Sequence, residues 1–176
     1  NDFIWVEKYR PKTVNDCILT KELTKTFNSF VSKGIPNLIL CGGPGVGKTT
    51  VAKAMLEESG CDYIMINGSM RGNIDTLRTD IQSYASTTSF DGTRKYIILD
   101  EADAMTTEAQ GALRRVIEIY SKNCRFCIIC NNIYSVLPGI QSRCTLMRFN
   151  ALKNENMSSR LNEIATKENV KIEKEG

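Results

Sequence analysis

Residues Gly42–Thr49 read GGPGVGKT and match the pattern GxxxxGK(S/T) in full. The pattern follows an apolar run at Leu38–Cys41 and leads directly into a segment of helical periodicity, which is the context that it requires. Glycines let the backbone N–H groups of such a loop turn inward around phosphate oxygens, and the following helix adds the positive end of its dipole. A glycine-rich turn without a ligand is the alternative, and the flanking strand and helix disfavour it. The sequence therefore predicts a phosphate-binding loop for a nucleotide.

The last two residues of this loop have side chains that suit two different roles. Lys48 is expected to reach the β- and γ-phosphates of ATP, and the Thr49 hydroxyl is expected to ligate Mg²⁺. The nucleotide contacts predicted in the loop and the first helical turn are Gly43, Pro44, Gly45, Val46, Gly47, Lys48, Thr49 and Thr50.

A second motif is the apolar run Tyr96–Leu99, which ends in the carboxylates Asp100 and Glu101. A strand of this kind places Asp100 at the carboxyl edge of a sheet beside the phosphate loop, where it is expected to bind Mg²⁺. Glu101 is then placed to orient and polarise the attacking water. A solvated strand end is the usual reading of Asp-Glu alone, but the phosphate loop some fifty residues earlier favours catalysis.

Short apolar runs alternate with helix-like segments along the chain. The pattern predicts strands at Leu38–Cys41, Tyr63–Asn67, Tyr96–Asp100, Phe126–Cys130 and Thr145–Phe149, and helices at Thr49–Ser59, Asn73–Ala85, Thr107–Ser121 and Asn154–Lys167. Alternation of this kind indicates an α/β fold with a parallel sheet covered by helices on both faces. Residues 1–20 are expected to form a lead-in, because Pro11 interrupts any early helix.

Composition excludes several other classes of protein. The 176 residues contain no histidine, which removes Ser-His-Asp and Cys-His hydrolases and most zinc hydrolases. Cys124, Cys127 and Cys130 have a spacing that occurs in metal sites, but they fall in a predicted buried strand, where residues three apart face opposite sides. We therefore expect reduced, buried thiols. No apolar run approaches the length of a membrane span, and the first residues do not resemble a signal peptide, so a soluble intracellular protein is expected.

Several motifs together resemble one family. The segment Trp5–Pro11 (WVEKYRP), the phosphate loop, the tetrad Asp100–Asp103 (DEAD) and Ser142–Cys144 (SRC) occur in this order. In this order they resemble the small, ATP-hydrolysing subunits of replication factor C, the sliding-clamp loader of the AAA+ class. The connection Ser89–Gly92 and the loop entry Cys41-Gly42-Gly43 are similar to the clamp-loader large subunit of T-even-type phages. DEAD also occurs in helicases, but those need two full RecA-like domains, for which this chain is too short.

The resemblance implies an AAA+ P-loop three-layer sandwich with a five-stranded sheet in the order 5-1-4-3-2. Residues 1–150 would form the ATPase core, and residues 151–176 would begin a helical lid domain. Tyr9, Arg10 and Pro11 would lie against the adenine. Asn131 would be a sensor of the γ-phosphate or the attacking water, with Asn132 as a close rival. Arg143 would be an arginine finger that acts in trans, in the site of a neighbouring subunit.

The same resemblance implies contacts with DNA. Arg71, Gly72 and Asn73 precede a predicted helix that carries Arg78, and a helix N-terminus flanked by arginine can hold backbone phosphate. Each of these arginines singly could equally be solvated surface, and the net charge of +3 does not by itself indicate a DNA-binding protein. On the helix after the carboxylates, Gln110 and Arg114 resemble residues that link DNA contact to the ATP site.

The implied function is ATP-driven opening of a sliding clamp and its loading onto primer–template DNA. The implied partners are other clamp-loader subunits in a ring or spiral, the clamp and the DNA, with no membrane. The compartment would be the host cytoplasm for a phage protein and the nucleus for a cellular eukaryotic one. Two alternatives stay open: another AAA+ DNA machine, such as a helicase loader or branch-migration motor, and a structural ring subunit that binds nucleotide without turnover.

Overall fold

A single parallel sheet organises the chain. The computed structural model describes residues 4–69, 74–89 and 92–173. The strands are β1 (Leu38–Cys41), β2 (Asp62–Asn67), β3 (Lys95–Asp100), β4 (Cys124–Cys130) and β5 (Thr145–Arg148). Neighbouring strands pair in parallel, in the order β2-β3-β4-β1-β5. This order confirms the one expected from the family resemblance, and the predicted strands lie within one or two residues of the observed ones.

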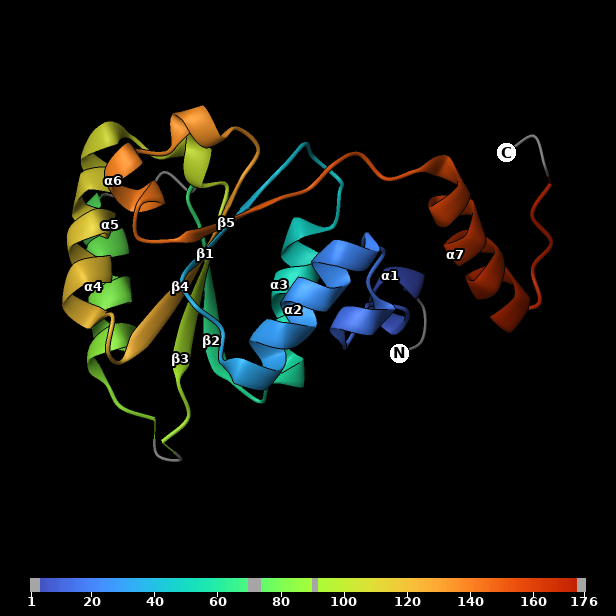
Figure 1. The fold of residues 1–176 in the computed structure, drawn as a ribbon, viewed down its shortest axis with the longest axis horizontal. Helices are drawn as coiled ribbons and strands as arrows, with labels where there is room; N and C mark the ends of the chain where they lie inside the picture. The colour runs from blue at the N-terminus through green and yellow to red at the C-terminus, as the bar shows by residue number, and fades with distance from the viewer. Residues whose placement is uncertain (1–3, 70–73, 90–91, 174–176) are drawn as a thin grey trace.

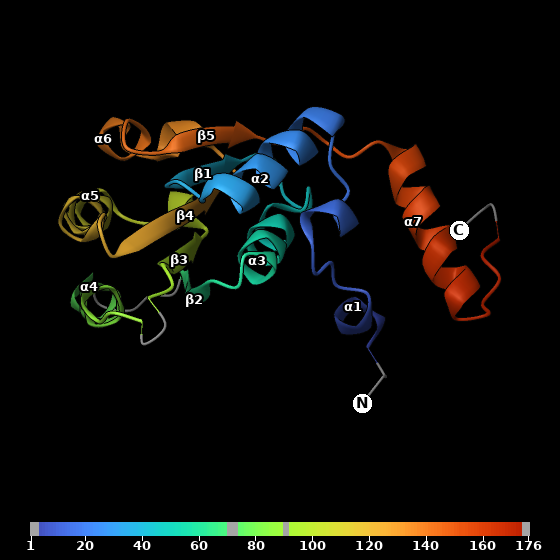
Figure 2. The same ribbon diagram turned by 60° about the horizontal axis from the view of Figure 1, so that its bottom comes forward.

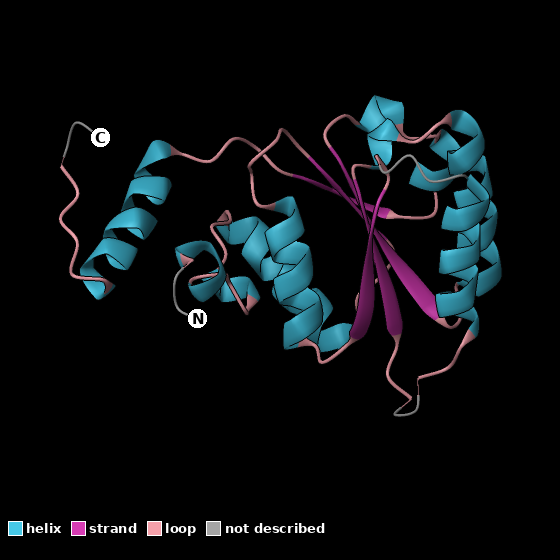
Figure 3. Cartoon of the chain, turned by 180° about the vertical axis from the view of Figure 1, so that it is seen from behind, coloured by secondary structure: helices cyan, strands magenta, loops and turns pink. Residues whose placement is uncertain are grey.

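Helices cover both faces of the sheet and give three layers (Figure 1, Figure 3). One face carries α2 (Lys21–Lys33) and α3 (Lys48–Glu58), and the other carries α4 (Ile74–Ser86) and α5 (Thr107–Tyr120). A short helix, α6 (Pro138–Gln141), leads into β5. Since both faces are covered, β1 is buried along its whole length, which explains its uninterrupted apolar sequence.

Strand β4 shows how the sequence divides between the two layers of core. Phe126 and Ile128 pack with the apolar face of α5, whereas Cys127 and Ile129 pack with α3 on the opposite side. Cys124 and Cys130 lie on the side of Phe126. The three thiols of β4 are therefore split between two faces and cannot share one metal ion. Burial raises the pKa of each of them to about 12, as expected for unreactive thiols that pack as small hydrophobes.

The helix α2 is not among the elements expected from the sequence. It begins after Thr20, whose hydroxyl accepts a hydrogen bond from Leu23 N at 3.3 Å, and it ends at Gly34, which has a φ of 107°. Phe27 anchors it by packing into the core, where its ring meets that of Phe149. The capping threonine and the terminal glycine are both readable signals of a helix, so this element could have been predicted.

Short elements complete the fold. They are α1 (Trp5–Lys8), which ends before Pro11, and the 3₁₀ turns η1 (Val14–Asp16), η2 (Ala102–Ala104) and η3 (Ile133–Ser135). The last helix, α7 (Asn154–Lys167), stands away from the sheet on the side of α1 (Figure 2). No helix within the described ranges is long and apolar enough to cross a membrane.

The N-terminal segment and the end of α7 are tied together by one carboxylate. Glu168 accepts a hydrogen bond from the Tyr9 hydroxyl at 2.6 Å and forms an ion pair with Lys8 at 2.7 Å. The bonds from Lys8 and Tyr9 hold the pKa of Glu168 below its usual value, while the bond to Glu168 raises the pKa of Tyr9. Segments 159 residues apart in the chain are thus joined.

Candidate nucleotide site

The phosphate loop leaves β1 through a position where only glycine fits. Gly42 N donates to Cys130 O at 3.3 Å, and a Cβ added at Gly42 would lie 2.5 Å from Phe149 O. Further along, Gly45 and Gly47 have φ values of 71° and 90°, which side chains rarely adopt. The loop then passes into α3 at Lys48, so its backbone wraps the amino end of that helix, as the motif predicts.

The Lys48 ammonium group is buried among neutral acceptors. Its Nζ donates to Gly42 O and Gly43 O, each at 2.6 Å, and to Asn131 Oδ1 at 3.0 Å, and the residue is only 7% exposed. No carboxylate within the described residues forms an ion pair with it. A buried cation is costly unless an anion is available to it. The site therefore presents an uncompensated positive charge that suits a phosphate group.

The two predicted metal ligands lie next to each other. Thr49 Oγ1 donates to Asp100 Oδ2 at 2.8 Å, and the other oxygen of this carboxylate accepts from Glu101 N at 2.8 Å. A hydroxyl and a carboxylate are the hard oxygen donors that Mg²⁺ prefers, and these two oxygens already converge beside the phosphate loop. The donor set therefore fits Mg²⁺.

Glu101 lies in a turn with an unusual backbone conformation. Its φ and ψ of 52° and 43° are left-handed, which costs a non-glycine residue roughly 1–2 kcal/mol. The turn is fixed by Gly68, whose N–H donates to Asp100 O at 2.7 Å, and a Cβ at Gly68 would come within 2.8 Å of Glu101 O. Strain of this kind concentrates at functional sites, and the Glu101 side chain is exposed here.

The structure separates the two candidate sensor residues. Asn131 directs its side-chain oxygen at Lys48, whereas Asn132 caps η3 by accepting from Tyr134 N at 3.0 Å. Asn131 therefore meets the phosphate loop, and Asn132 stabilises a turn.

A further site residue, Asp103, is not singled out by the sequence. Its Oδ2 accepts from the backbone N–H groups of Asn131 and Asn132, at 3.0 Å and 3.3 Å. It therefore fixes the backbone of these two candidate sensor residues, here called the sensor loop, against the turn that holds Glu101. The only available signal is its membership of the DEAD tetrad, which also occurs in helicases.

A cavity of about 220 Å³ lies beside the loop, where the base of a nucleotide is expected. Among the predicted contacts it is lined by Tyr9, Pro11, Gly45, Val46, Gly47 and Thr50. Ile18, Leu152 and Arg160 also line it and were not predicted. Arg10 is not among the lining residues, and it pairs instead with Glu7 at 2.7 Å. A larger cavity of about 610 Å³ lies between α2 and residues 147–153, but it contains only Val46 of the predicted contacts, so the smaller one is the better candidate for the base.

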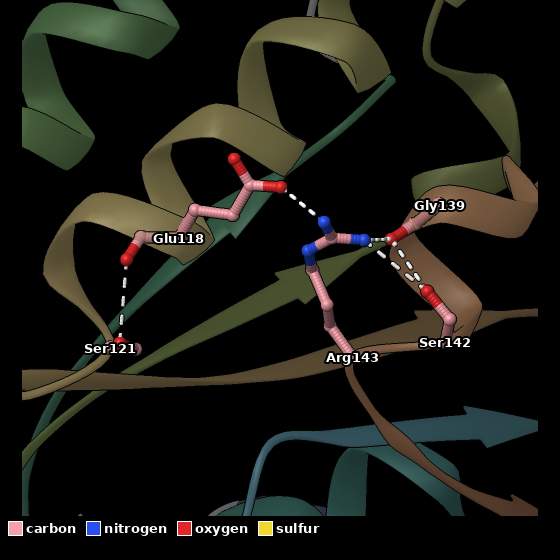
Figure 4. A network of polar contacts seen from close by, with 5 residues as sticks. All are labelled: Glu118, Ser121, Gly139, Ser142 and Arg143. Atoms are coloured by element: carbon pink, nitrogen blue, oxygen red, sulfur yellow. Dashed lines mark hydrogen bonds and ion pairs between the residues drawn. The ribbon is translucent and has the colours of Figure 1, made fainter.

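The predicted finger, Arg143, lies between α6 and β5, which is an edge strand of the sheet. Its Nη1 donates to Gly139 O at 2.5 Å and to Ser142 Oγ at 3.3 Å, and its Nη2 forms an ion pair with Glu118 on α5 (Figure 4). The side chain is partly exposed. An exposed guanidinium at a sheet edge is open to a neighbouring molecule.

The predicted DNA contacts fall mostly outside the described residues. Arg71, Gly72 and Asn73 belong to that part of the chain, while Arg78 lies exposed on α4. On α5, Gln110 is buried and connects the start of the helix to the β4–α6 connection: its Nε2 donates to Ser135 O at 2.8 Å, and its Oε1 accepts from Leu137 N at 2.8 Å. Arg114 packs over Gly139, where an added Cβ would lie 2.8 Å from Arg114 Cδ.

Comparison with known proteins places this geometry in a family. Residues 38–152 match the family model described as "ATPase family associated with various cellular activities (AAA)". Replication factor C subunit 5 from Mus musculus is 45% identical over 180 residues, which cover 98% of this chain and 53% of the mouse protein. The replication factor C small subunit of Methanococcus maripaludis strain S2 is 42% identical over 179 residues, which cover 98% of this chain and 57% of that protein. The chain thus spans about half the length of the curated relatives it matches.

Solved structures agree on the fold. RuvB from Thermotoga maritima, described as a Holliday junction branch migration motor, superposes with a TM-score of 0.73 at 18% identity, over 94% of this chain and 56% of that one. Identity this low shows the fold alone. The residues that match the family model include all five strands, the phosphate loop and the carboxylates described above. The chain belongs to the AAA family of ATPases.

Proposed function

We propose that this chain is the ATP-hydrolysing core of a clamp-loader subunit, which uses ATP to open a sliding clamp and load it onto primer–template DNA. The observation that carries the proposal is the buried, uncompensated Lys48 at the junction of the loops after β1 and β4. The high identity to replication factor C subunits over nearly the whole chain supports the cellular role. The finer similarity to phage clamp loaders stays a prediction, and the compartment would be the one that holds the replicating DNA.

The described residues suit ATP hydrolysis by positioning and charge neutralisation. Lys48 would exchange its carbonyl acceptors for the β- and γ-phosphates, and the backbone of the loop would hold the remaining phosphate oxygens. Thr49 and Asp100 would hold Mg²⁺, which would neutralise phosphate charge when bound. Glu101 would accept a hydrogen bond from the attacking water and polarise it, and Asn131 would report the γ-phosphate.

Two parts of the proposal concern assembly. Residues 1–150 would form the core, and α7 would be the first helix of a lid domain. Through its hydrogen bond to Tyr9, which lines the base cavity, Glu168 would couple the position of the lid to the bound base. Arg143 would complete the nucleotide site of the next subunit in a ring or spiral. A guanidinium stays charged and offers a planar donor fork, which suits charge that develops on γ-phosphate oxygens.

The test is the ATPase rate of the full-length complex with and without clamp and primed DNA. Clamp and DNA together should stimulate turnover. Stimulation by DNA alone, with no effect of the clamp, would favour a helicase loader or branch-migration motor instead. Nucleotide binding without turnover under every condition would favour a structural ring subunit.

Variants of the complex test the trans role of Arg143. Arg143→Ala should leave ATP affinity at its own subunit unchanged while hydrolysis at the adjacent site falls by ~10³–10⁵, the range for fingers supplied in trans. Mixing Arg143→Ala subunits with Lys48→Ala subunits should restore turnover only where an intact finger meets an intact loop. Wild-type turnover of a normally assembled Arg143→Ala complex would remove the finger assignment.

A further inference from the structure

The guanidinium of Arg143 is held from two different elements. Its Nη1 donates to Gly139 O and Ser142 Oγ, which lie four residues and one residue earlier in the chain. Its Nη2 donates to Glu118, which lies 25 residues earlier on α5 (Figure 4). Among the described residues, Glu118 is therefore the one that ties the guanidinium to an element outside the α6–β5 turn.

The hydrogen bonds occupy only part of the guanidinium. Its Nη1 donates to Gly139 O and Ser142 Oγ, and its Nη2 donates to Glu118. The Nε–H group has no hydrogen-bond partner within the described residues. The contacts thus hold both Nη atoms while Nε–H stays available to an acceptor such as a phosphate oxygen.

Stability does not account for the Glu118 contact. The side chains of Glu118 and Arg143 are 43% and 36% exposed, and ion pairs at such positions contribute little to the free energy of unfolding. The larger effect of Glu118 is on the orientation of Arg143. An unrestrained arginine side chain samples many rotamers, and it loses that conformational entropy when it must adopt the single geometry that binds a phosphate.

The helix that carries Glu118 also belongs to the subunit's own nucleotide site. Helix α5 comes next in the chain after η2, the turn that contains Asp103 and follows Asp100 and Glu101. Its Gln110 forms hydrogen bonds with the β4–α6 connection. We infer that Glu118 is a positioning residue that orients the guanidinium of Arg143 for the nucleotide of a neighbouring subunit and makes that orientation depend on the placement of α5. This inference rests on the proposed trans role of Arg143.

The test uses the full-length complex and four variants of this chain: Glu118→Ala, Glu118→Gln, Arg143→Ala and the double variant Glu118→Ala/Arg143→Ala. Glu118→Ala should lower the clamp- and DNA-stimulated kcat by about 10–100-fold, the scale of a misplaced catalytic group, with the KM for ATP unchanged. Glu118→Gln keeps an acceptor oxygen and should lose less. The double variant should match Arg143→Ala alone, because Glu118 acts only through the arginine. Glu108→Ala, an exposed glutamate of the same helix, is the control and should behave as wild type.

The outcomes separate this inference from the finger assignment. If Arg143→Ala keeps full turnover, the finger assignment itself is wrong. If Arg143→Ala loses turnover but both Glu118 variants keep it, only the positioning role is overturned. Faster basal hydrolysis by Glu118→Ala before clamp and DNA are added would also overturn it, because the carboxylate would then restrain the arginine. If Glu118→Ala does not assemble, as judged by size-exclusion chromatography, the nearly isosteric Glu118→Gln decides by the same kcat and KM readout.

Discussion

Lys48 Nζ donates a hydrogen bond to Asn131 Oδ1 across 3.0 Å, although the two residues lie 83 positions apart in the chain. The contact exists because β1 and β4 are neighbours in register, with Cys41 opposite Cys130, so the residues that follow them leave the sheet at the same edge. Because β1, β3 and β4 are parallel, their carboxyl ends lie at one edge of the sheet, which brings together the phosphate loop, the carboxylates and the candidate sensor Asn131.

Lys48→Ala should abolish tight ATP binding, because it removes the cation that faces the β- and γ-phosphates. Titration with a fluorescent ATP analogue measures this directly, and Lys25→Ala on the exposed side of α2 serves as the control. Undiminished affinity in Lys48→Ala would mean that the nucleotide site lies elsewhere.

Glu101→Gln should bind ATP with wild-type affinity but hydrolyse it slowly. The amide keeps the size of the side chain and loses the charge that polarises water, and such groups contribute about 10²–10⁴-fold to rates. Single-turnover hydrolysis measured beside nucleotide binding separates the two effects. If turnover persists, the catalytic role belongs to another residue.

Asp103→Ala should lower turnover while ATP affinity changes little. The substitution removes both bonds to the backbone N–H groups of Asn131 and Asn132, each worth about 1.5–3 kcal/mol for a charged acceptor. The sensor loop would then no longer be fixed relative to Glu101. Asp103→Asn keeps an acceptor oxygen and should retain more activity, so equal turnover in both variants and wild type would refute a role in placing the sensor.

Gly42→Ala should destabilise the nucleotide-free protein by about 1–3 kcal/mol, the usual range for overpacking. Its Cβ would lie 2.5 Å from Phe149 O, whereas a Cβ at the neighbouring Gly43 would meet nothing within 4 Å. Urea denaturation of both variants is a matched comparison, and Gly43→Ala should stay within about 0.5 kcal/mol of wild type. Equal stability of the two would show that the strand end can shift to make room.

Arg78→Ala should weaken DNA binding similarly for all sequences and reduce the salt slope of binding by about one unit, as the loss of one phosphate contact does. Lys33→Ala, on the helix that covers the other face of the sheet, is the charge-matched control. Fluorescence anisotropy at several salt concentrations gives the slopes. Identical slopes for Arg78→Ala and wild type would show that Arg78 makes no contact with a DNA phosphate.

Much of the site could be predicted from the sequence because its signals are local. The phosphate loop requires glycine conformations between a strand and a helix, and Gly45 and Gly47 adopt the positive φ that the motif implies. The Asp100–Glu101 pair follows an apolar strand, and a parallel sheet must bring that strand end to the same edge as the loop. Arg10 was predicted from the family resemblance to lie against the base, but its side chain turns to Glu7, three residues earlier.

The sequence by itself determined the strands, the phosphate loop and the pair of acidic residues, because hydrophobic periodicity and backbone requirements act over a few neighbouring residues. Only the tertiary structure decided which polar side chains meet across the fold. Asp103 holds the backbone of Asn131, Glu168 binds Tyr9, and Glu118 pairs with Arg143. These pairs are separated by 28, 159 and 25 residues. No local pattern encodes them, because each depends on strand order, helix placement and the rotamers that packing selects.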